Sequence, residues 1–174
     1  TTPQVFADPE PKNWLHRPIV DVAAERVQEV RVTRGKSAYV LSRKDRAQAN
    51  FALTSAPKGK VLASETSGNY AGTALAGLEL DDVKKLDAAL CQSPPDHAEI
   101  RTFDGWVIGV DGRTEGDQHW IRLSSRYDEA LAKAFPAPSV DPKAAAAKPA
   151  PPDVAKEAPD LAARVAEWTY EVPK

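Results

Sequence analysis

AEIRTFDGWVIGVDGRTEGDQHWIRLSSRY, residues 98–127, carries the clearest strand pattern in the chain. Apolar side chains occupy alternate positions in residues 106–111 and again in residues 119–127. A period of two, bounded by Gly and Asp, is typical of half-buried β-strands. The dipeptide Asp104-Gly105 predicts a two-residue type I′ turn, because that turn needs positive φ at both central positions. A longer polar connection then leads into a third strand, so the stretch predicts an antiparallel meander.

A second group of short strands is predicted in residues 26–54, where apolar and charged side chains alternate between tight polar turns. Between the two groups, residues 67–80 place Tyr70 and Leu78 among apolar side chains at helical spacing. Gly72 costs about 1 kcal/mol relative to Ala inside such a helix. The expected fold class is therefore α+β. Two antiparallel β-meanders, residues 26–54 and 98–127, are expected to pack with one main helix.

The composition changes after Tyr127. A short helix is predicted at residues 129–135, and residues 136–159 are then dominated by Pro and Ala. Such a segment buries too little apolar surface to offset its ordering entropy, which predicts a semi-extended linker. Residues 160–174 return to helical spacing and then alternate as a strand. We expect one α+β domain (residues 1–135), the linker, and a C-terminal helix/strand segment that returns to this domain or to a partner molecule.

Charge and composition exclude several classes of protein. The 174 residues suffice for a domain with its own core. The 23 basic and 25 acidic residues are interspersed without a basic stripe, so no nucleic-acid partner is expected. No apolar run reaches the roughly 18 residues of a membrane span, and no signal peptide is recognisable. Since the chain begins at Thr1 and contains no Met, we expect a processed or truncated piece, from which an upstream signal or anchor could have been removed.

The sequence contains no recognisable catalytic or metal-binding constellation. The loop with Asp111, Glu115 and Asp117 lacks the distal bidentate Glu of a calcium loop, and residues 57–60 lack the glycine spacing of a phosphate-binding loop. No nucleophile-elbow sequence frames a serine, and the one cysteine, Cys91, resembles a buried small residue. We therefore expect no enzymatic activity, no metal and no cofactor. The histidines share no metal-ligand spacing; they are His16, His97 and His119.

Several phrases together suggest a family. Their order and spacing match a pattern of a WL entry phrase, a leucine-rich helix running into a DV pair, a TFDG hairpin and a late W-x-Y-x-V-P. They cover nearly the whole chain except the Pro/Ala segment. In these features the chain resembles the bacterial family catalogued as domain of unknown function 4340. The phrases are NWLHRPIVDVAAERVQEVRV (13–32), AYVLSRK (38–44), ALAGLELDDVKKLD (74–87), TFDGWVIGV (102–110), HWIRL (119–123) and EWTYEVP (167–173).

The resemblance implies an N-terminal membrane anchor followed by an extracytoplasmic region, in a family of which some members occur with ABC-transport or gliding-motility components. It implies a non-enzymatic, periplasmic accessory domain of a membrane-anchored envelope protein. Such a domain would bind a membrane protein, such as a component of an ABC-type transport system. The alternative hypothesis is a binding protein for a small apolar or lipid ligand held between sheet and helix, because aromatic side chains can line such a cavity. The candidate interaction surface comprises Trp106, Trp120, Tyr127 and Trp168.

Overall fold

The computed structural model describes residues 13–86, 96–136 and 153–173. This part of the chain is mostly β-structure with a few helices, which confirms the α+β class. The helical elements are η2 (Ala24–Arg26), α1 (Asn69–Gly72), α3 (Glu129–Ala134) and α5 (Val154–Val165). The strands are β1 (Pro18–Val20), β2 (Val27–Arg34), β3 (Ser37–Ser42), β4 (Ala52–Ser55), β5 (Leu78–Glu79), β6 (Asp82–Lys85), β7 (Asp96–Thr102), β8 (Trp106–Glu115), β9 (Gln118–Tyr127) and β10 (Trp168–Val172).

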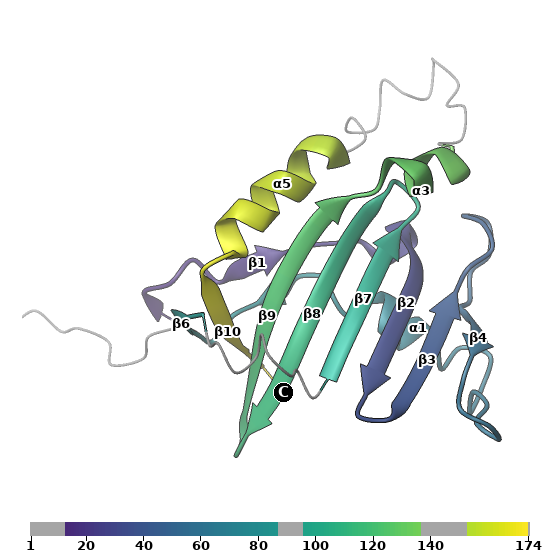
Figure 1. Ribbon diagram of the computed structural model, residues 1–174, viewed down its shortest axis with the longest axis horizontal. Helices are drawn as coiled ribbons and strands as arrows, with labels where there is room; N and C mark the ends of the chain where they lie inside the picture. The colour runs from purple at the N-terminus through teal and green to yellow at the C-terminus, as the bar shows by residue number, and fades with distance from the viewer. Residues whose placement is uncertain (1–12, 87–95, 137–152, 174) are drawn as a thin grey trace, which may run out of the picture.

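Eight of these strands form one antiparallel sheet in the order β4-β3-β2-β7-β8-β9-β10-β6 (Figure 1). Both predicted strand groups are present, but they are not separate units, because β2 pairs with β7 along most of its length. The C-terminal strand β10 pairs with β9 on one side and with β6 on the other. It therefore lies inside the sheet of its own chain. Strands β1 and β5 form a separate two-stranded ribbon.

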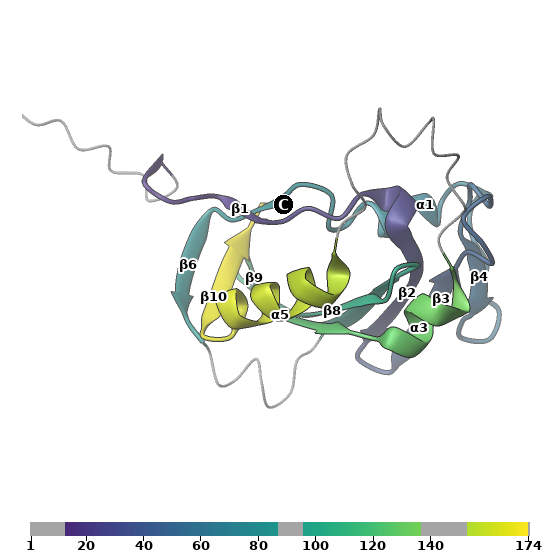
Figure 2. The same cartoon turned by 90° about the horizontal axis from the view of Figure 1, so that it is seen from above.

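The sheet is curved, and α1, α5 and the β1–β5 ribbon lie on its concave side (Figure 2). Alternating residues of neighbouring strands build an apolar row across this face, because their partners in register also point inward. The row runs through Leu41, Val30, Ile100 and Ile108. Helix α5 adds its own buried face, which recurs at helical spacing. The side chains of that face are Val154, Ala158, Leu161 and Val165.

The turn at Asp104-Gly105 differs from the prediction. A type I′ turn needs two residues at positive φ, but Gly105, at 87°, is the one residue of this turn with positive φ. The Gly105 amide donates to the Thr102 carbonyl at 3.1 Å, and the strands are joined by a three-residue loop. A three-residue loop with a left-handed Gly at its last position is a common hairpin connection.

The predicted main helix at residues 67–80 is wrong. Helix α1 contains four residues of it, and the chain on both sides forms successive turns with bonds between residues three apart. Close packing explains the difference. A Cβ on Gly72 would lie 2.6 Å from the Phe51 ring, and one on Gly68 would lie 3.2 Å from the Phe51 backbone oxygen. The glycines serve this contact, and they weaken helix propensity over the rest of the segment.

The main helix is instead α5, which begins inside the segment predicted as a linker. Residues 154–159 are helical, so the predicted boundary at 159 is wrong; residues 137–152 and Cys91 lie outside the described residues. Pro159 stands within the helix and removes one backbone hydrogen bond, to the Ala155 carbonyl. The buried face of α5, packed on β9 and β8, stabilises the helix despite this loss.

Candidate functional site

The four aromatic residues proposed as an interaction surface do not come together. Trp106 is buried in the core on the concave face. Trp120 is also buried, but strand alternation places it on the convex face, where Lys84 Nζ lies 3.9 Å from its ring centroid. Tyr127, opposite Trp106 in the β8–β9 ladder, is exposed, and Trp168 is half-buried at the far end of the sheet. These positions do not define one surface.

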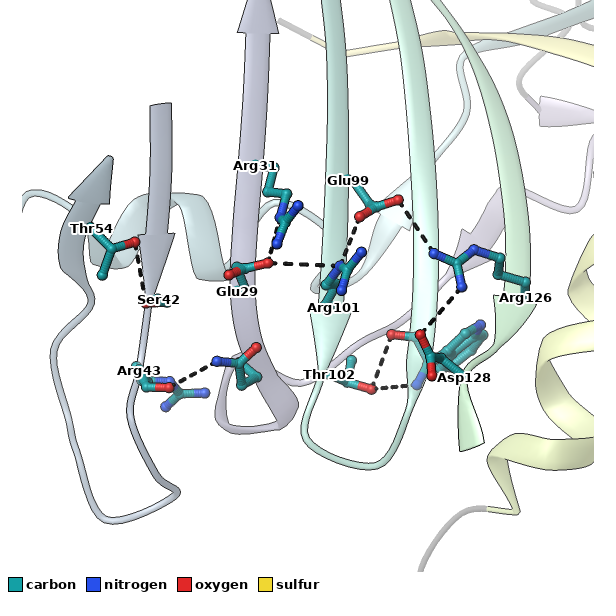
Figure 3. A network of polar contacts seen from close by, with 12 residues as sticks. Glu29, Arg31, Ser42, Arg43, Thr54, Glu99, Arg101, Thr102, Arg126 and Asp128 are labelled. Carbon is teal, nitrogen blue, oxygen red and sulfur yellow. Dashed lines mark hydrogen bonds and ion pairs between the residues drawn. The ribbon is translucent and has the colours of Figure 1, made fainter. Parts of the chain in front are cut away.

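The convex face of the sheet carries a network of alternating charges (Figure 3). Glu29 accepts from Arg31 at 2.6 Å, and Glu99 accepts from Arg101 at 2.7 Å. Burial alone would raise the pKa of Glu99, but the Arg101 hydrogen bond and the charges of Arg101, Arg126 and Arg31 outweigh it and lower that pKa. Each of these two acids is paired with bases on its own strand or on a neighbouring strand, so the charges of this face compensate one another.

An acid, a base and a hydroxyl lie near one another on the same face. His97 Nδ1 is 2.6 Å from Asp111 Oδ1, and both side chains flank Gly109, whose missing Cβ leaves room for the Ser124 hydroxyl. A nucleophilic serine needs a hydrogen bond to its base. No hydrogen bond joins Ser124 to His97 in the structure, and the His97 side chain is 44% exposed. The pair is an ordinary cross-strand hydrogen bond in this geometry.

The remaining predicted positions are also dispersed. Glu115 is engaged by Arg113 and lies 3.9 Å from Lys84, while His119 contacts Thr114. Within residues 13–86, 96–136 and 153–173, no group of three or more His, Cys, Asp or Glu side chains could hold a metal ion. No helix of this part of the chain is both long and apolar enough to cross a bilayer.

A cavity with a largely apolar lining lies between strands β3–β4 and helix α1. It is a groove of about 640 Å³. Leu41 and Leu53 of the sheet face the groove, Val61 and Leu62 line it from the loop after β4, and Tyr70 lines it from α1. Lys60 is the one charged residue that lines it. We call this cavity the β3–β4 groove. It is a hydrophobic concavity with few polar groups, the usual form of a small-molecule site.

Two contacts hold α1 against the sheet and so fix one wall of the β3–β4 groove. The Asn69 carboxamide accepts from the Phe51 backbone amide at 3.1 Å and donates to Asn50 Oδ1 at 2.8 Å. Gly72 lies directly against the Phe51 ring, and the Arg43 guanidinium lies 4.8 Å from the centroid of the same ring. Because Phe51 is buried, the position of α1 depends on this ring.

Arg43 completes the support beneath the groove. Its guanidinium is buried and donates to the carbonyls of Ala24 at 2.8 Å and Glu25 at 2.9 Å, while its Nε donates to Val27 at 2.9 Å. Desolvation by burial lowers the pKa of Arg43, and the charge of Glu25 opposes that effect. The backbone acceptors compensate a buried cation, so its role here is structural.

A smaller cavity of about 280 Å³ lies at the opposite end of the sheet, beside β1 and β10. It is lined by Leu15, Trp168 and Tyr170 among others, and Arg164 reaches it from α5. The Arg164 guanidinium already donates to the Ile19 carbonyl. Burial raises the pKa of the Tyr170 hydroxyl, and the charge of Arg164 opposes that effect. This cavity is smaller than the β3–β4 groove, and its cation is already hydrogen-bonded.

Sequence reasoning missed the residues of the β3–β4 groove. Tyr39 and Tyr70 fall in a predicted strand and a predicted helix, and no sequence pattern relates the two positions to each other. One local signal was present: Pro57-Lys58-Gly59-Lys60 is a turn sequence, and Gly59 has φ of 80°. The Lys60 amide donates to the Pro57 carbonyl at 3.1 Å, which closes that turn beside the groove.

Comparisons with known proteins add no relative. The resemblance to the domain of unknown function 4340 family therefore stays a prediction. No protein-family model matches the chain, and neither the curated proteins nor the solved structures contain a match.

Proposed function

We propose that the protein is a binding protein for a small apolar or lipid ligand, held in the β3–β4 groove between sheet and helix. One observation carries the proposal. Among the described residues, five large hydrophobic side chains are exposed, and three of them line this groove. Those three are Tyr39, Val61 and Tyr70.

The exposure of these side chains is large enough to matter energetically. Val61 is 85% exposed and Tyr70 is 83% exposed, although both stand beside the apolar floor formed by Leu41 and Leu53. Covering apolar surface is worth about 25 cal/mol per Å². A contiguous exposed apolar patch on a soluble domain marks a binding surface more often than scattered single side chains do. The groove volume also falls within the roughly 300–1,000 Å³ range of ligand sites.

An uncharged apolar dye, N-phenyl-1-naphthylamine, tests the proposal. We expect its fluorescence to rise on binding to the wild-type protein, and the Tyr70→Ser and Val61→Ser variants to bind it more weakly. Both side chains are exposed, so neither change should unfold the domain. Tyr127→Ser is the matched control, because Tyr127 is an exposed tyrosine outside the groove. Equal dye binding by all four proteins would contradict the proposal.

The second candidate function is a non-enzymatic accessory domain of a membrane-anchored envelope protein, which binds a membrane protein partner of an ABC-type transport system. Strands β4 and β6 favour it, because among residues 13–86, 96–136 and 153–173 each ends the sheet and pairs on one side only. A partner segment can add to such an edge as a further strand. Co-purification with membrane proteins encoded beside this chain is the test, and recovery of none of them would count against this function.

A further inference from the structure

Building on the proposed function, we infer that the ligand of the β3–β4 groove is a single-chain fatty acid. Its hydrocarbon chain would lie on the apolar floor of the groove, and its carboxylate would bind the ammonium group of Lys60. The proposal assigns the groove a chemical class of ligand and gives Lys60 a specificity-determining role.

Lys60 combines position and availability. It lines the β3–β4 groove and also the shallower cavity next to it, so its side chain borders the apolar surface that would receive the chain. No carboxylate of the described residues forms an ion pair with it, because the Asp and Glu side chains that form ion pairs there do so with other bases. An ammonium group beside apolar surface complements an anionic headgroup.

The surroundings of Lys60 reinforce its charge. Lys58 precedes it in the same turn, and Lys36 immediately precedes Ser37, which lines the groove. Neither forms an ion pair with a described carboxylate, and residues 36–65 contain six basic residues (Lys36, Arg43, Lys44, Arg46, Lys58 and Lys60) but two acidic ones, Asp45 and Glu65. The protein as a whole carries a net charge of −2. The local excess of bases is therefore a property of this site rather than of the composition.

The turn geometry fixes where the charge stands. A type II turn needs positive φ at its third residue, and Gly59 has φ of 80° there. The backbone hydrogen bond from Lys60 to Pro57 closes the turn. Pro57 and Lys60 both line the groove, so this turn forms part of its rim. The backbone of Lys60 is thereby held at the groove mouth, and a flexible side chain of four methylenes carries the charge.

Size and charge select the class of amphiphile. The groove of about 640 Å³ fits one ligand of modest size and is open at its surface. One cation lines it, which matches a monoanionic carboxylate. A fatty acid meets both conditions, since it has one chain and one negative charge.

Binding of dodecanoate and of dodecanol, measured by displacement of the uncharged dye, tests the inference. The two ligands share the chain and differ in headgroup charge. We expect the wild-type protein to bind dodecanoate about two- to fivefold more tightly, the factor that an exposed ion pair supplies. Lys60→Gln should remove that preference, so that the variant binds dodecanoate and dodecanol with equal affinity. Lys133→Gln is the control, because Lys133 is an exposed lysine of α3, paired with Glu129 and outside the groove.

The outcomes separate this inference from the proposed function. Equal affinity for dodecanoate and dodecanol in the wild type, or a preference that survives Lys60→Gln, overturns the fatty-acid inference and leaves the apolar binding function intact. Failure of both ligands and of the dye to bind overturns both proposals. If the groove variants bind both ligands normally but lose self-association in sedimentation, the occupant is a second copy, and the inference is overturned. A preference that weakens as salt rises to about 1 M supports it, because screening acts on the exposed ion pair.

Discussion

Replacing Gly72 by Ala places helix propensity and packing in opposition. Gly72 is the last residue of α1 and has ordinary helical geometry, so propensity alone predicts that Ala would stabilise the protein. The structure predicts the opposite sign. A Cβ on Gly72 would lie 2.6 Å from Phe51 Cε2 and 3.0 Å from Phe51 Cζ, well inside contact distance. The Phe51 ring is buried between α1 and the Arg43 guanidinium, which limits how far it can move.

The two effects can be weighed. Exchanging Gly for Ala within a helix gains up to about 1 kcal/mol. Inserting a methyl group into a packed core costs about 1–3 kcal/mol. Because the close contact at Gly72 is with a buried ring rather than a flexible chain end, we expect a cost near the upper end of that range. The net expectation is a destabilisation of about 1–2 kcal/mol, with weaker dye binding because Tyr70 and Ala71 of the same helix line the groove.

Chemical denaturation of the wild type, Gly72→Ala, Phe51→Leu and the double variant measures this coupling. Phe51→Leu removes the ring atoms that the new methyl group would meet, so adding Gly72→Ala to it should be neutral or stabilising. The interaction free energy between the two sites is then favourable by about 1 kcal/mol or more. A stabilising Gly72→Ala change in the wild-type background, or an additive double variant, would refute the packing argument.

Two further predictions concern the hairpin and the convex face. Gly105→Ala should destabilise the protein by about 3 kcal/mol, because its Cβ would lie 2.5 Å from the Asp128 carbonyl at a φ of 87°. Gly116 has φ of 61° and open space around it, so Gly116→Ala should lower the free energy of unfolding by about 1 kcal/mol. Equal losses for Gly105→Ala and Gly116→Ala in chemical denaturation would disprove the close approach at Gly105. Burial would raise the pKa of Glu99, but the hydrogen bond and charge of Arg101 outweigh burial and lower that pKa. Glu99 therefore stabilises the fold above its unfolded pKa of about 4.3, and it loses that contribution as pH falls through the folded value. The stability difference between wild type and Glu99→Gln should therefore shrink below about pH 4, whereas a pH-independent difference would contradict this.

The strands were predictable because their cause is local. Alternation of apolar and polar side chains marked residues 26–54 and 98–127, and both groups form strands. The short helix at residues 129–135 was also predictable, because Asp128 caps it and accepts from the Leu131 amide at 3.0 Å. That hydrogen bond lowers the pKa of Asp128, and burial opposes the effect. Sequence patterns within a single element thus predict most of the strands and the short helix α3.

The errors arose where tertiary contacts override local preference. Pro159 and the surrounding Ala residues suggested a linker, yet Val154, Ala158 and Leu161 bury one face of α5 on the sheet. The predicted helix at residues 67–80 does not form because Gly72 provides room for the Phe51 ring, a tertiary contact that helix propensity does not include. Both outcomes depend on residues far away in sequence. The residue pattern within a short stretch of sequence does not contain that information.

The β3–β4 groove was unpredictable for the same reason, since it joins residues from three separate segments. Tyr39 belongs to β3, Leu53 to β4 and Tyr70 to α1, and only the antiparallel pairing of β3 with β4 and the Asn69 contacts bring them together. The Pro57–Lys60 turn is recognisable in the sequence, but its residues do not indicate that it borders an apolar cavity. What matters about this turn is its place beside apolar surface.

The groove follows from how the concave face is covered. A sheet with one apolar face needs a second layer over that face. Helix α5 packs on β8 and β9, and the β1–β5 ribbon lies over the same side, but at β3 and β4 the described cover is one turn of helix with its flanking loops. Leu53 and Tyr39 are consequently left partly exposed beside a cavity. An apolar chain bound there would extend the second layer to the edge of the sheet, so ligand binding and completion of the core become the same event.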